Sequence, residues 1–294
     1  MSILKNVNTE LRNPKSFNLD KMAIGEAVNL MIEEEYNVIE ALNEQHSNIT
    51  EVINHTSQAL KNGGRIIYVG AGTSGRLGIL DAVECPPTFS VDYNTVVGLI
   101  AGGEKAFIQA VEGAEDDPLF AHNDLENINL TDKDIVIGIA ASGRTPYVIG
   151  AFEYAKQIGA KTVAISCSKQ AKISEYADLA VEAVPGPEVL TGSTRLKAGT
   201  TQKLILNMIS TLSMVSVGKV YQNLMVDVKP SNIKLVERAK RIICEATGVD
   251  YKIAQEVYQK ANNSVKIAIV MILNDCSYEQ ALAILEKNNN FIKS

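Results

Sequence analysis

The central part of the chain alternates short apolar runs with longer stretches of helical periodicity. Five nearly continuous apolar runs occur at residues 66–69, 95–101, 134–141, 162–166 and 179–184. Runs of this kind are typical of parallel strands buried on both faces, and the helical stretches between them can serve as crossover connections. The pattern predicts an α/β fold in which a parallel sheet carries helices on both faces.

Helical periodicity without strands marks both ends of the chain. A polar N-terminal arm leads into two predicted helices, one beginning at residues 18–20 and one at about 45–61. Beyond residue 230 the pattern predicts four short helices at about 231–246, 250–261, 264–273 and 277–287. We therefore expect three parts: an arm with helices at 1–62, an α/β domain at 63–230 and a small all-helical bundle at 231–294.

Charge and hydropathy narrow the classes of partner. The net charge is -6 at pH 7 and no long basic run occurs, which argues against nucleic acid as the main partner. The N-terminus lacks a signal pattern, and no uncharged apolar run approaches the ~20 residues of a membrane span. We expect a soluble protein without a membrane partner.

Cysteine spacing points to reduced thiols rather than to a metal or disulfide framework. Four cysteines are scattered at 85, 167, 244 and 276, without a C-x-x-C pair. This usage fits a cytoplasmic location. No cluster of histidine, cysteine and carboxylate residues has metal-ligand spacing, so we expect no metal.

Three turns rich in glycine and hydroxyl residues follow predicted strands or open predicted helices. They lie at 70–75, 142–145 and 191–200, and the third opens an apolar helix at about 195–218. Unpaired backbone N–H groups of such turns and of the first helical turn bind anions, phosphate above all. Ser193 or Thr194 is the expected N-terminal cap of the helix that the third turn opens. The candidate phosphate and substrate ligands are Gly72, Thr73, Ser74, Ser142, Gly143, Arg144, Thr145, Ser193, Thr194 and Lys197.

Two nucleotide-binding interpretations of the first turn fit poorly. Residues 70–75 satisfy G-x-G-x-x-G, but the next predicted strand ends in 101–103, Ala-Gly-Gly, without the acid that would hold a ribose. A Walker loop needs Lys and Ser/Thr where this chain has Arg76 and Leu77. A phosphate cradle without nucleotide or magnesium is favoured, and a turn needed only for packing is the alternative.

Nucleophilic catalysis finds little support among the three histidines, His46, His55 and His122. A triad would need one of them to reach Ser74 or Ser142, and neither serine lies in G-x-S-x-G. We interpret the histidines as structural, with His55 or His122 at most a substrate contact.

Carboxylates therefore remain as candidate acids and bases. Glu84 precedes Cys85 and two prolines, which we expect to end its helix. Burial against these neighbours would raise the pKa of Glu84 and keep it protonated, as a general acid requires. Glu112 and Glu115 follow the second predicted strand, and the sequence gives no physical ranking between them.

Several long motifs resemble those of the N-acetylmuramic acid 6-phosphate etherases. The resemblance covers nearly the whole chain, whereas the broader sugar-isomerase (SIS) fold shares only the phosphate turns. The similar segments are 9–10, 12–14, 69–88, 100–103, 111–116, 140–147 and 191–200.

The resemblance implies an SIS-type sandwich, flavodoxin-like or Rossmann-like in its layers, with a C-terminal bundle similar to ubiquitin-associated domains. It implies cleavage of the D-lactyl ether of N-acetylmuramic acid 6-phosphate by syn elimination and water addition, without metal or nucleotide cofactor. By position, Glu84 would be the proton donor and Glu115 the second acid/base, which selects Glu115 over Glu112. It also implies a homodimer with the active site near the interface.

Two other functions share part of this pattern. A sugar-phosphate aldose–ketose isomerase would use the same cradle and one carboxylate base, without a second acid placed like Glu84. A non-enzymatic sugar-phosphate sensor would keep the turns and could lose both Glu84 and Glu115. The presence of both acids favours the etherase interpretation.

Overall fold

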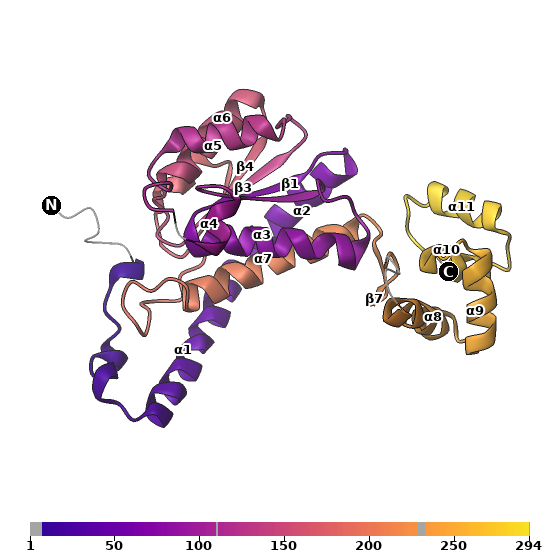
Figure 1. Ribbon diagram of the computed structural model, residues 1–294, viewed down its shortest axis with the longest axis horizontal. Coiled ribbons are helices and arrows are strands. Elements are labelled where there is room, and N and C mark those ends of the chain that lie inside the picture. Colours follow the sequence, from indigo (N-terminus) through magenta and orange to yellow (C-terminus); the bar gives the residue numbers. More distant parts are fainter. Residues whose placement is uncertain (1–7, 110, 229–232, 294) are drawn as a thin grey trace. The chain divides into compact units, whose positions relative to one another are not determined.

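A computed structural model describes residues 8–109, 111–228 and 233–293 of the chain (Figure 1). It divides into two compact units, Met1–Val83 with Asn94–Ser210, and Glu84–Tyr93 with Thr211–Ser294. The domain boundary predicted at residue 230 falls outside the described residues.

The first unit contains one parallel sheet of five strands. The strands are β1 (Ile66–Gly70), β2 (Val96–Ile100), β3 (Ile135–Ala140), β4 (Lys161–Ser166) and β5 (Leu179–Glu182). Their order is β2-β1-β3-β4-β5, and Ile66 of β1 pairs with Val96 on one side and Ile135 on the other. The predicted parallel sheet is confirmed. The strand order reverses between β1 and β3, and ligands of open α/β sheets bind at such a switch point.

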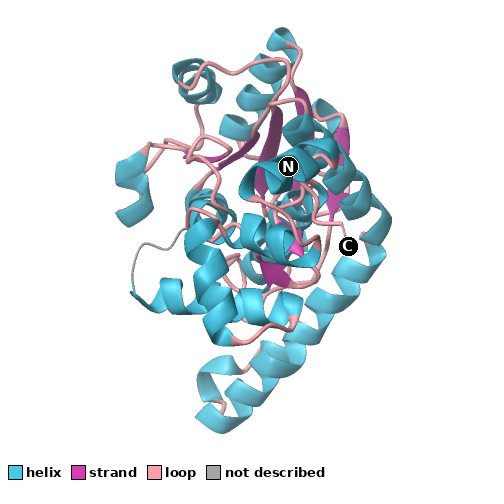
Figure 2. Cartoon of the chain, turned by 90° about the vertical axis from the view of Figure 1, so that its right-hand side faces the viewer, coloured by secondary structure: helices cyan, strands magenta, loops and turns pink. Residues whose placement is uncertain are grey.

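Helices lie on both sides of the strands, as predicted (Figure 2). In the first unit, α5 and α6 lie on one side of the sheet, and α2 and α3 lie on the other (Figure 1). The helices of this part are α1 (Ile24–Glu44), α2 (His46–Lys61), α3 (Gly72–Phe89), α4 (Glu104–Ile108), α5 (Pro118–Asn127), α6 (Pro146–Ile158) and α7 (Lys197–Ser216).

The core under α6 explains why the third apolar run contains a glycine. A Cβ added to Gly138 of β3 would lie 2.4 Å from Val148 and 2.5 Å from Phe152, both fully buried on α6. Only glycine lets α6 approach this closely.

The opposite face of the sheet holds a buried carboxylate, Asp81, which accepts hydrogen bonds from Tyr68 Oη (3.0 Å) and Asn207 Nδ2 (2.6 Å). Burial raises the pKa of Asp81.

Two helical predictions need correction. The polar stretch after residue 116 contains a helix, α5, which the apolar pattern did not predict. Its signals are a cap and a proline: Asp117 Oδ1 accepts from Leu119 N–H at 2.8 Å, and Pro118 occupies the first turn. The first helix begins at Ile24 because Met22 and Ala23 have extended backbones.

Helix α3 does not end before its two prolines, as we expected, but continues through Pro86 and Pro87 to Phe89. A proline has no N–H to donate, but its carbonyl still accepts a helical hydrogen bond and its φ suits a helix. The backbone N–H of Ser90 donates to Pro86 O at 3.0 Å. The prolines therefore remove two donors near the end of the helix without stopping it.

The second unit is mainly helical and confirms the four predicted C-terminal helices. They are α8 (Ile233–Thr247), α9 (Tyr251–Lys260), α10 (Val265–Leu273) and α11 (Tyr278–Lys287). Asp250, Ser264 and Ser277 cap the last three by accepting backbone N–H groups. A two-stranded hairpin, β6 (Val220–Tyr221) and β7 (Leu224–Met225), was not predicted.

No single described helix is both long and apolar enough to cross a bilayer. Together, α10 and α11 reach that length and composition, with a bend of 97° between them.

Candidate functional site

The first glycine turn joins β1 to α3 directly: the strand ends at Gly70 and the helix begins at Gly72. A Cβ added to Gly75 would lie 2.6 Å from Gly70 O, so these two glycines serve close packing of helix on strand. At Gly72 the backbone conformation, and not close packing, favours glycine. Its φ of +52° lies in the left-handed region, and nothing lies within 4 Å of an added Cβ. The turn around Gly72 is thus open, as an anion site requires.

The second turn follows β3 and is held from behind by the chain after β4. Gly143 has a φ of +71°, and its carbonyl accepts the N–H of Ile173 at 2.9 Å. A Cβ added to Gly143 would lie 2.4 Å from that of Ala171. The Glu182 carboxylate in turn accepts the N–H groups of Gln170 (2.8 Å) and Ala171 (2.9 Å). Sequence reasoning did not identify this support.

The third turn meets both of the others at the start of α7. A Cβ added to Gly199 would lie 3.6 Å from Thr73 Cγ2, and Ser74 Oγ donates to Gln202 Oε1 at 2.9 Å. Beside the second turn, Ala141 packs with Cys167 and Ala198 in a small buried cluster. The three predicted turns therefore converge in the first unit.

Burial also fixes the state of the cysteine in this cluster. Cys167 is 1% exposed, and its Sγ donates to Ala198 O at 3.6 Å. Desolvation, with a smaller contribution from the Glu188 carboxylate, raises the pKa of the thiol well above its ordinary value. A neutral buried thiol is a packing group and not a nucleophile.

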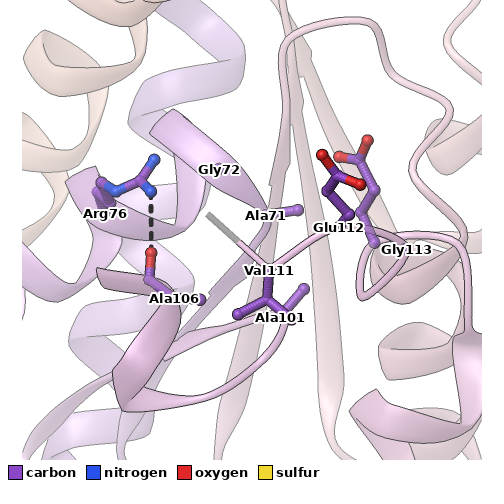
Figure 3. A pocket seen from close by; sticks show the side chains of 9 residues that line it. Ala71, Gly72, Arg76, Ala101, Ala106, Val111, Glu112 and Gly113 are labelled. Carbon is purple, nitrogen blue, oxygen red and sulfur yellow. Dashed lines mark hydrogen bonds between the residues drawn. The ribbon is translucent and has the colours of Figure 1, made fainter. Parts of the chain in front are cut away.

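A cavity of about 260 Å³ opens beside the first turn, at the carboxyl ends of β1 and β2. Glu112 and Arg76 reach it from opposite sides, with Gly72 between them (Figure 3). Arg76, which sequence reasoning used only to reject a Walker loop, is tied to α4 by hydrogen bonds of 2.9 Å to the carbonyls of Ala106 and Phe107. It is the one basic side chain among the described residues that line this cavity.

Glu115 lines the same cavity, and its backbone is held by α6. The N–H of Tyr147, in the first turn of α6, donates to Glu115 O at 3.0 Å, and Tyr147 Oη donates to Asp124 at 2.5 Å. Glu112 also lines a neighbouring cavity of about 790 Å³, which Glu115 does not line. The backbone bond to Tyr147 holds Glu115 between the first turn and the helix after the second. The bond fixes the main chain at residue 115, while the carboxylates of Glu112 and Glu115 are both exposed at this cavity.

Comparisons with known proteins agree on fold and family. Residues 48–156 match the glucokinase regulatory protein N-terminal SIS domain, and residues 110–212 match the SIS domain. A curated N-acetylmuramic acid 6-phosphate etherase from Francisella tularensis subsp. novicida is 80% identical over 100% of both chains. Another, from Bacillus mycoides, is 59% identical over 99% of both chains.

The chain belongs to the N-acetylmuramic acid 6-phosphate etherase family.

Solved structures support the same fold outside the etherase family. A phosphoheptose isomerase from Neisseria gonorrhoeae is 16% identical with a TM-score of 0.52, and one from Francisella tularensis is 19% identical with a TM-score of 0.50. Each match covers 65% of this chain and 98% of the other. At this identity the similarity shows the SIS fold alone.

Glu84, the proton donor implied by the resemblance to the etherase family, belongs to the second unit. It is exposed on α3, and Val83 beside it in the sequence is 49% exposed. The expected burial of Glu84 against its apolar neighbours is therefore wrong, although Cys85 and Pro86 are themselves buried. Thr88 Oγ1 donates to the backbone carbonyl of Glu84 at 2.8 Å, a contact that does not involve the carboxylate.

Lys197, a predicted phosphate ligand, is instead engaged in a buried ion pair. It is 1% exposed, and its Nζ lies 2.5 Å from Glu34 Oε2 on α1. Glu34 also accepts from Lys15 Nζ (2.9 Å) and Asn13 Nδ2 (2.8 Å), so the N-terminal arm lies against this pair. Desolvation opposes ionisation, but the hydrogen bonds from Lys197, Lys15 and Asn13 prevail and lower the pKa of Glu34.

The start of α7 is capped by an acid that the sequence did not reveal. The carboxylate of Glu188, 1% exposed, accepts the N–H groups of Lys197 (3.0 Å) and Ala198 (2.9 Å). The predicted cap by Ser193 or Thr194 is therefore wrong. Burial raises the pKa of Glu188 despite these two hydrogen bonds. Because the first amides of α7 already have an acceptor, the half-buried hydroxyls of Ser193 and Thr194 are what the third turn can offer a ligand.

We expect Lys197→Met to lower the free energy of unfolding by about 3–5 kcal/mol, because it leaves Glu34 buried without its cation. The measurement is urea unfolding followed by circular dichroism. Lys15→Met removes the exposed partner of the same carboxylate and should cost much less. Equal stability of the two variants, with a raised KM only for Lys197→Met, would instead make Lys197 a substrate ligand.

The remaining candidates lie at the surface or away from the cavities. Ser142 and Thr145 are half-buried, and Arg144 is exposed. The ring of His122 lies 5.3 Å from that of Tyr154, and neither His122 nor His55 lines either cavity at the first turn. Within the described residues, no three histidine, cysteine or acidic side chains are placed to hold a metal ion.

Proposed function

We propose that this chain is a carbon–oxygen lyase that converts N-acetylmuramic acid 6-phosphate to N-acetylglucosamine 6-phosphate and D-lactate. The observation that carries the proposal is the meeting, at one cavity, of an open glycine turn and of Glu115, whose backbone carbonyl accepts the N–H of Tyr147, in a member of the etherase family. The reaction serves the recycling of cell-wall sugar. All four cysteines are free, which supports a cytoplasmic location.

The chemistry is an elimination followed by a hydration. In the open-chain sugar the C1 aldehyde acidifies the C2 proton, a carboxylate removes it, and an acid protonates the ether oxygen as the C3–O bond breaks. Water then adds to C3 of the unsaturated intermediate, and the proton at C2 is restored. D-lactate leaves with the ether oxygen as its hydroxyl. We assign protonation of the ether oxygen to Glu84 and removal of the C2 proton to Glu115.

The three turns are the proposed binding site for the sugar phosphate. The backbone N–H of Gly72 and the hydroxyls of Thr73, Ser74 and Ser142 can donate to phosphate and sugar oxygens. Gly143, whose own N–H donates to Ala140 O at 2.9 Å, shapes the second turn beside them. The further ligands proposed from the sequence are Arg144, Thr145, Ser193 and Thr194. Lys197 is left out because its ammonium group is paired with Glu34.

Turnover in ¹⁸O-labelled water tests the proposed reaction. We expect one label at the C3 hydroxyl of N-acetylglucosamine 6-phosphate and none in D-lactate, because water adds to the sugar carbon. Label in D-lactate would mean displacement at the lactyl carbon. Isomerisation of a sugar phosphate without release of D-lactate would identify an aldose–ketose isomerase, and binding without turnover would identify a sensor.

The homodimer is proposed from the exposed face of α1. Apolar residues recur at helical spacing along this helix and are exposed, with Ile24 at 84% and Tyr36 at 69%. They are Ile24, Val28, Met31, Ile32, Tyr36 and Ile39. An exposed apolar stripe of this length marks an interaction surface, and a two-fold axis lets the same stripe cover itself in a second copy.

The same surface adjoins the third turn. A groove of about 260 Å³ beside the stripe is lined by Ile32, Tyr36 and, from α7, Thr200 and Leu204. Thr200 follows Gly199, which packs against Thr73 of the first turn. This continuity supports an active site near the subunit interface.

We expect the double variant Ile32→Lys/Tyr36→Lys to sediment as a monomer where the wild type sediments as a dimer. The dimer should dissociate because its interface would have to desolvate two ammonium groups from each copy. Leu119→Lys changes an equally exposed apolar residue on α5 and should leave the dimer intact. A dimeric double variant would place the interface elsewhere.

A further inference from the structure

The side chain of Gln202 on α7 is buried against the first turn with only one end of its amide satisfied. Gln202 is 1% exposed, and its Oε1 accepts a hydrogen bond of 2.9 Å from Ser74 Oγ, itself 7% exposed. Its Nε2 is buried and has no hydrogen-bond partner in the described part of the chain. A buried donor without an acceptor is unfavourable, so this arrangement needs an explanation.

The direction of this hydrogen bond decides what Ser74 can offer a ligand. A serine hydroxyl has one proton to donate and two lone pairs that accept. While Ser74 donates to Gln202 Oε1, only its lone pairs remain for the open turn around Gly72, and lone pairs repel an anionic oxygen. A phosphate oxygen needs the proton.

Rotation of the amide by 180° reverses this polarity within the same packing. The Oε1 and Nε2 groups of glutamine are nearly equal in size, so the exchange needs no movement of α7. In the rotated state Nε2 donates to Ser74 Oγ, the position without a partner passes from the Nε2 donor to the Oε1 acceptor, and the hydroxyl proton becomes available to an anion. The backbone around Gln202 is held meanwhile by Gly199, which packs against Thr73.

We propose that Gln202 is a positioning residue that sets the hydrogen-bond direction of Ser74, and that a phosphate at the first turn selects the amide orientation in which Nε2 donates to Ser74 Oγ. This inference rests on the proposed sugar-phosphate substrate. It assigns Gln202 no contact with the substrate, because the amide acts through Ser74 alone.

The variant Gln202→Glu tests the inference directly. A carboxylate of the same shape only accepts, so it fixes Ser74 as its donor and withholds the proton from phosphate. We expect the Kd for N-acetylglucosamine 6-phosphate, measured by calorimetry, to rise about 10- to 100-fold, with KM rising in parallel and kcat nearly unchanged. Gln58→Glu, the same change at an exposed position of α2, should bind as the wild type does.

A second substitution at the same position keeps the inference falsifiable if the buried carboxylate prevents folding. Gln202→Met has a similar length and neither donates nor holds the hydroxyl as a strong acceptor. Ser74 then loses its fixed orientation but can still donate, so we expect the Kd to rise by a smaller factor of about 3 to 10. A Kd unchanged in a folded Gln202→Met or Gln202→Glu variant would overturn the inference.

A double-mutant cycle separates positioning from a general loss of structure. In a Ser74→Ala background, neither substitution at Gln202 should weaken binding further, because there is no hydroxyl left to orient. Full additivity would overturn the inference. If instead wild-type protein released no D-lactate yet bound N-acetylglucosamine 6-phosphate, the proposed reaction would fail while the binding cycle still reported on Gln202.

Discussion

Glu115→Gln is expected to lower kcat for D-lactate release by about 10²- to 10⁴-fold, the range typical of losing one general acid or base. Glutamine preserves the shape of the side chain and cannot take up a proton. The backbone carbonyl of residue 115 would still accept the N–H of Tyr147, so the cavity should keep its form. Binding of N-acetylglucosamine 6-phosphate should therefore change little.

Glu112→Gln is the matched control, because Glu112 lines the same cavity and lies on the same segment. Its turnover should stay close to that of the wild type. A reversed result, with Glu112→Gln inactive and Glu115→Gln active, would contradict the assignment of proton removal to Glu115, which rests on the resemblance to the etherase family. If both variants turned over normally, proton transfer would not involve this cavity.

Glu84→Gln is expected to lower D-lactate release about as strongly as Glu115→Gln does, but for a different reason. If Glu84 supplies the proton to the departing ether oxygen, its loss stops C3–O cleavage but leaves removal of the C2 proton possible. In deuterated water this variant should still exchange the C2 hydrogen of N-acetylmuramic acid 6-phosphate, which mass spectrometry detects. Glu115→Gln should lose that exchange.

The opposite pattern would interchange the two roles, with Glu84 as the base at C2. Glu245→Gln controls for removing one negative charge from the second unit, because Glu245 is an exposed residue of α8. It should release D-lactate at the wild-type rate. Normal turnover by Glu84→Gln would remove this residue from the mechanism altogether.

Local sequence patterns were sufficient to predict the sheet, the turns and the C-terminal helices. Continuous apolar runs such as 66–69 and 134–141 are typical of strands buried on both faces of a parallel sheet, and these two form β1 and β3. Gly72 and Gly143 adopt left-handed backbones that favour glycine, which makes such turns visible without a structure. The family motifs added roles for Glu84 and Glu115 that periodicity could not assign.

Only the tertiary structure decided which polar groups meet. Lys197 pairs with Glu34, 163 residues away, and Ser74 meets Gln202, 128 residues away. No local rule connects such positions, because a charged or amide side chain leaves the same signal whether it faces solvent, a ligand or a buried partner. The anchoring of Glu115 and the exposure of Glu84 are of this kind. The sequence by itself determined the sheet, its ligand-binding edge and the open turns, since these depend on backbone conformation and hydrophobic periodicity. The partners of each side chain at that edge were decided by long-range packing.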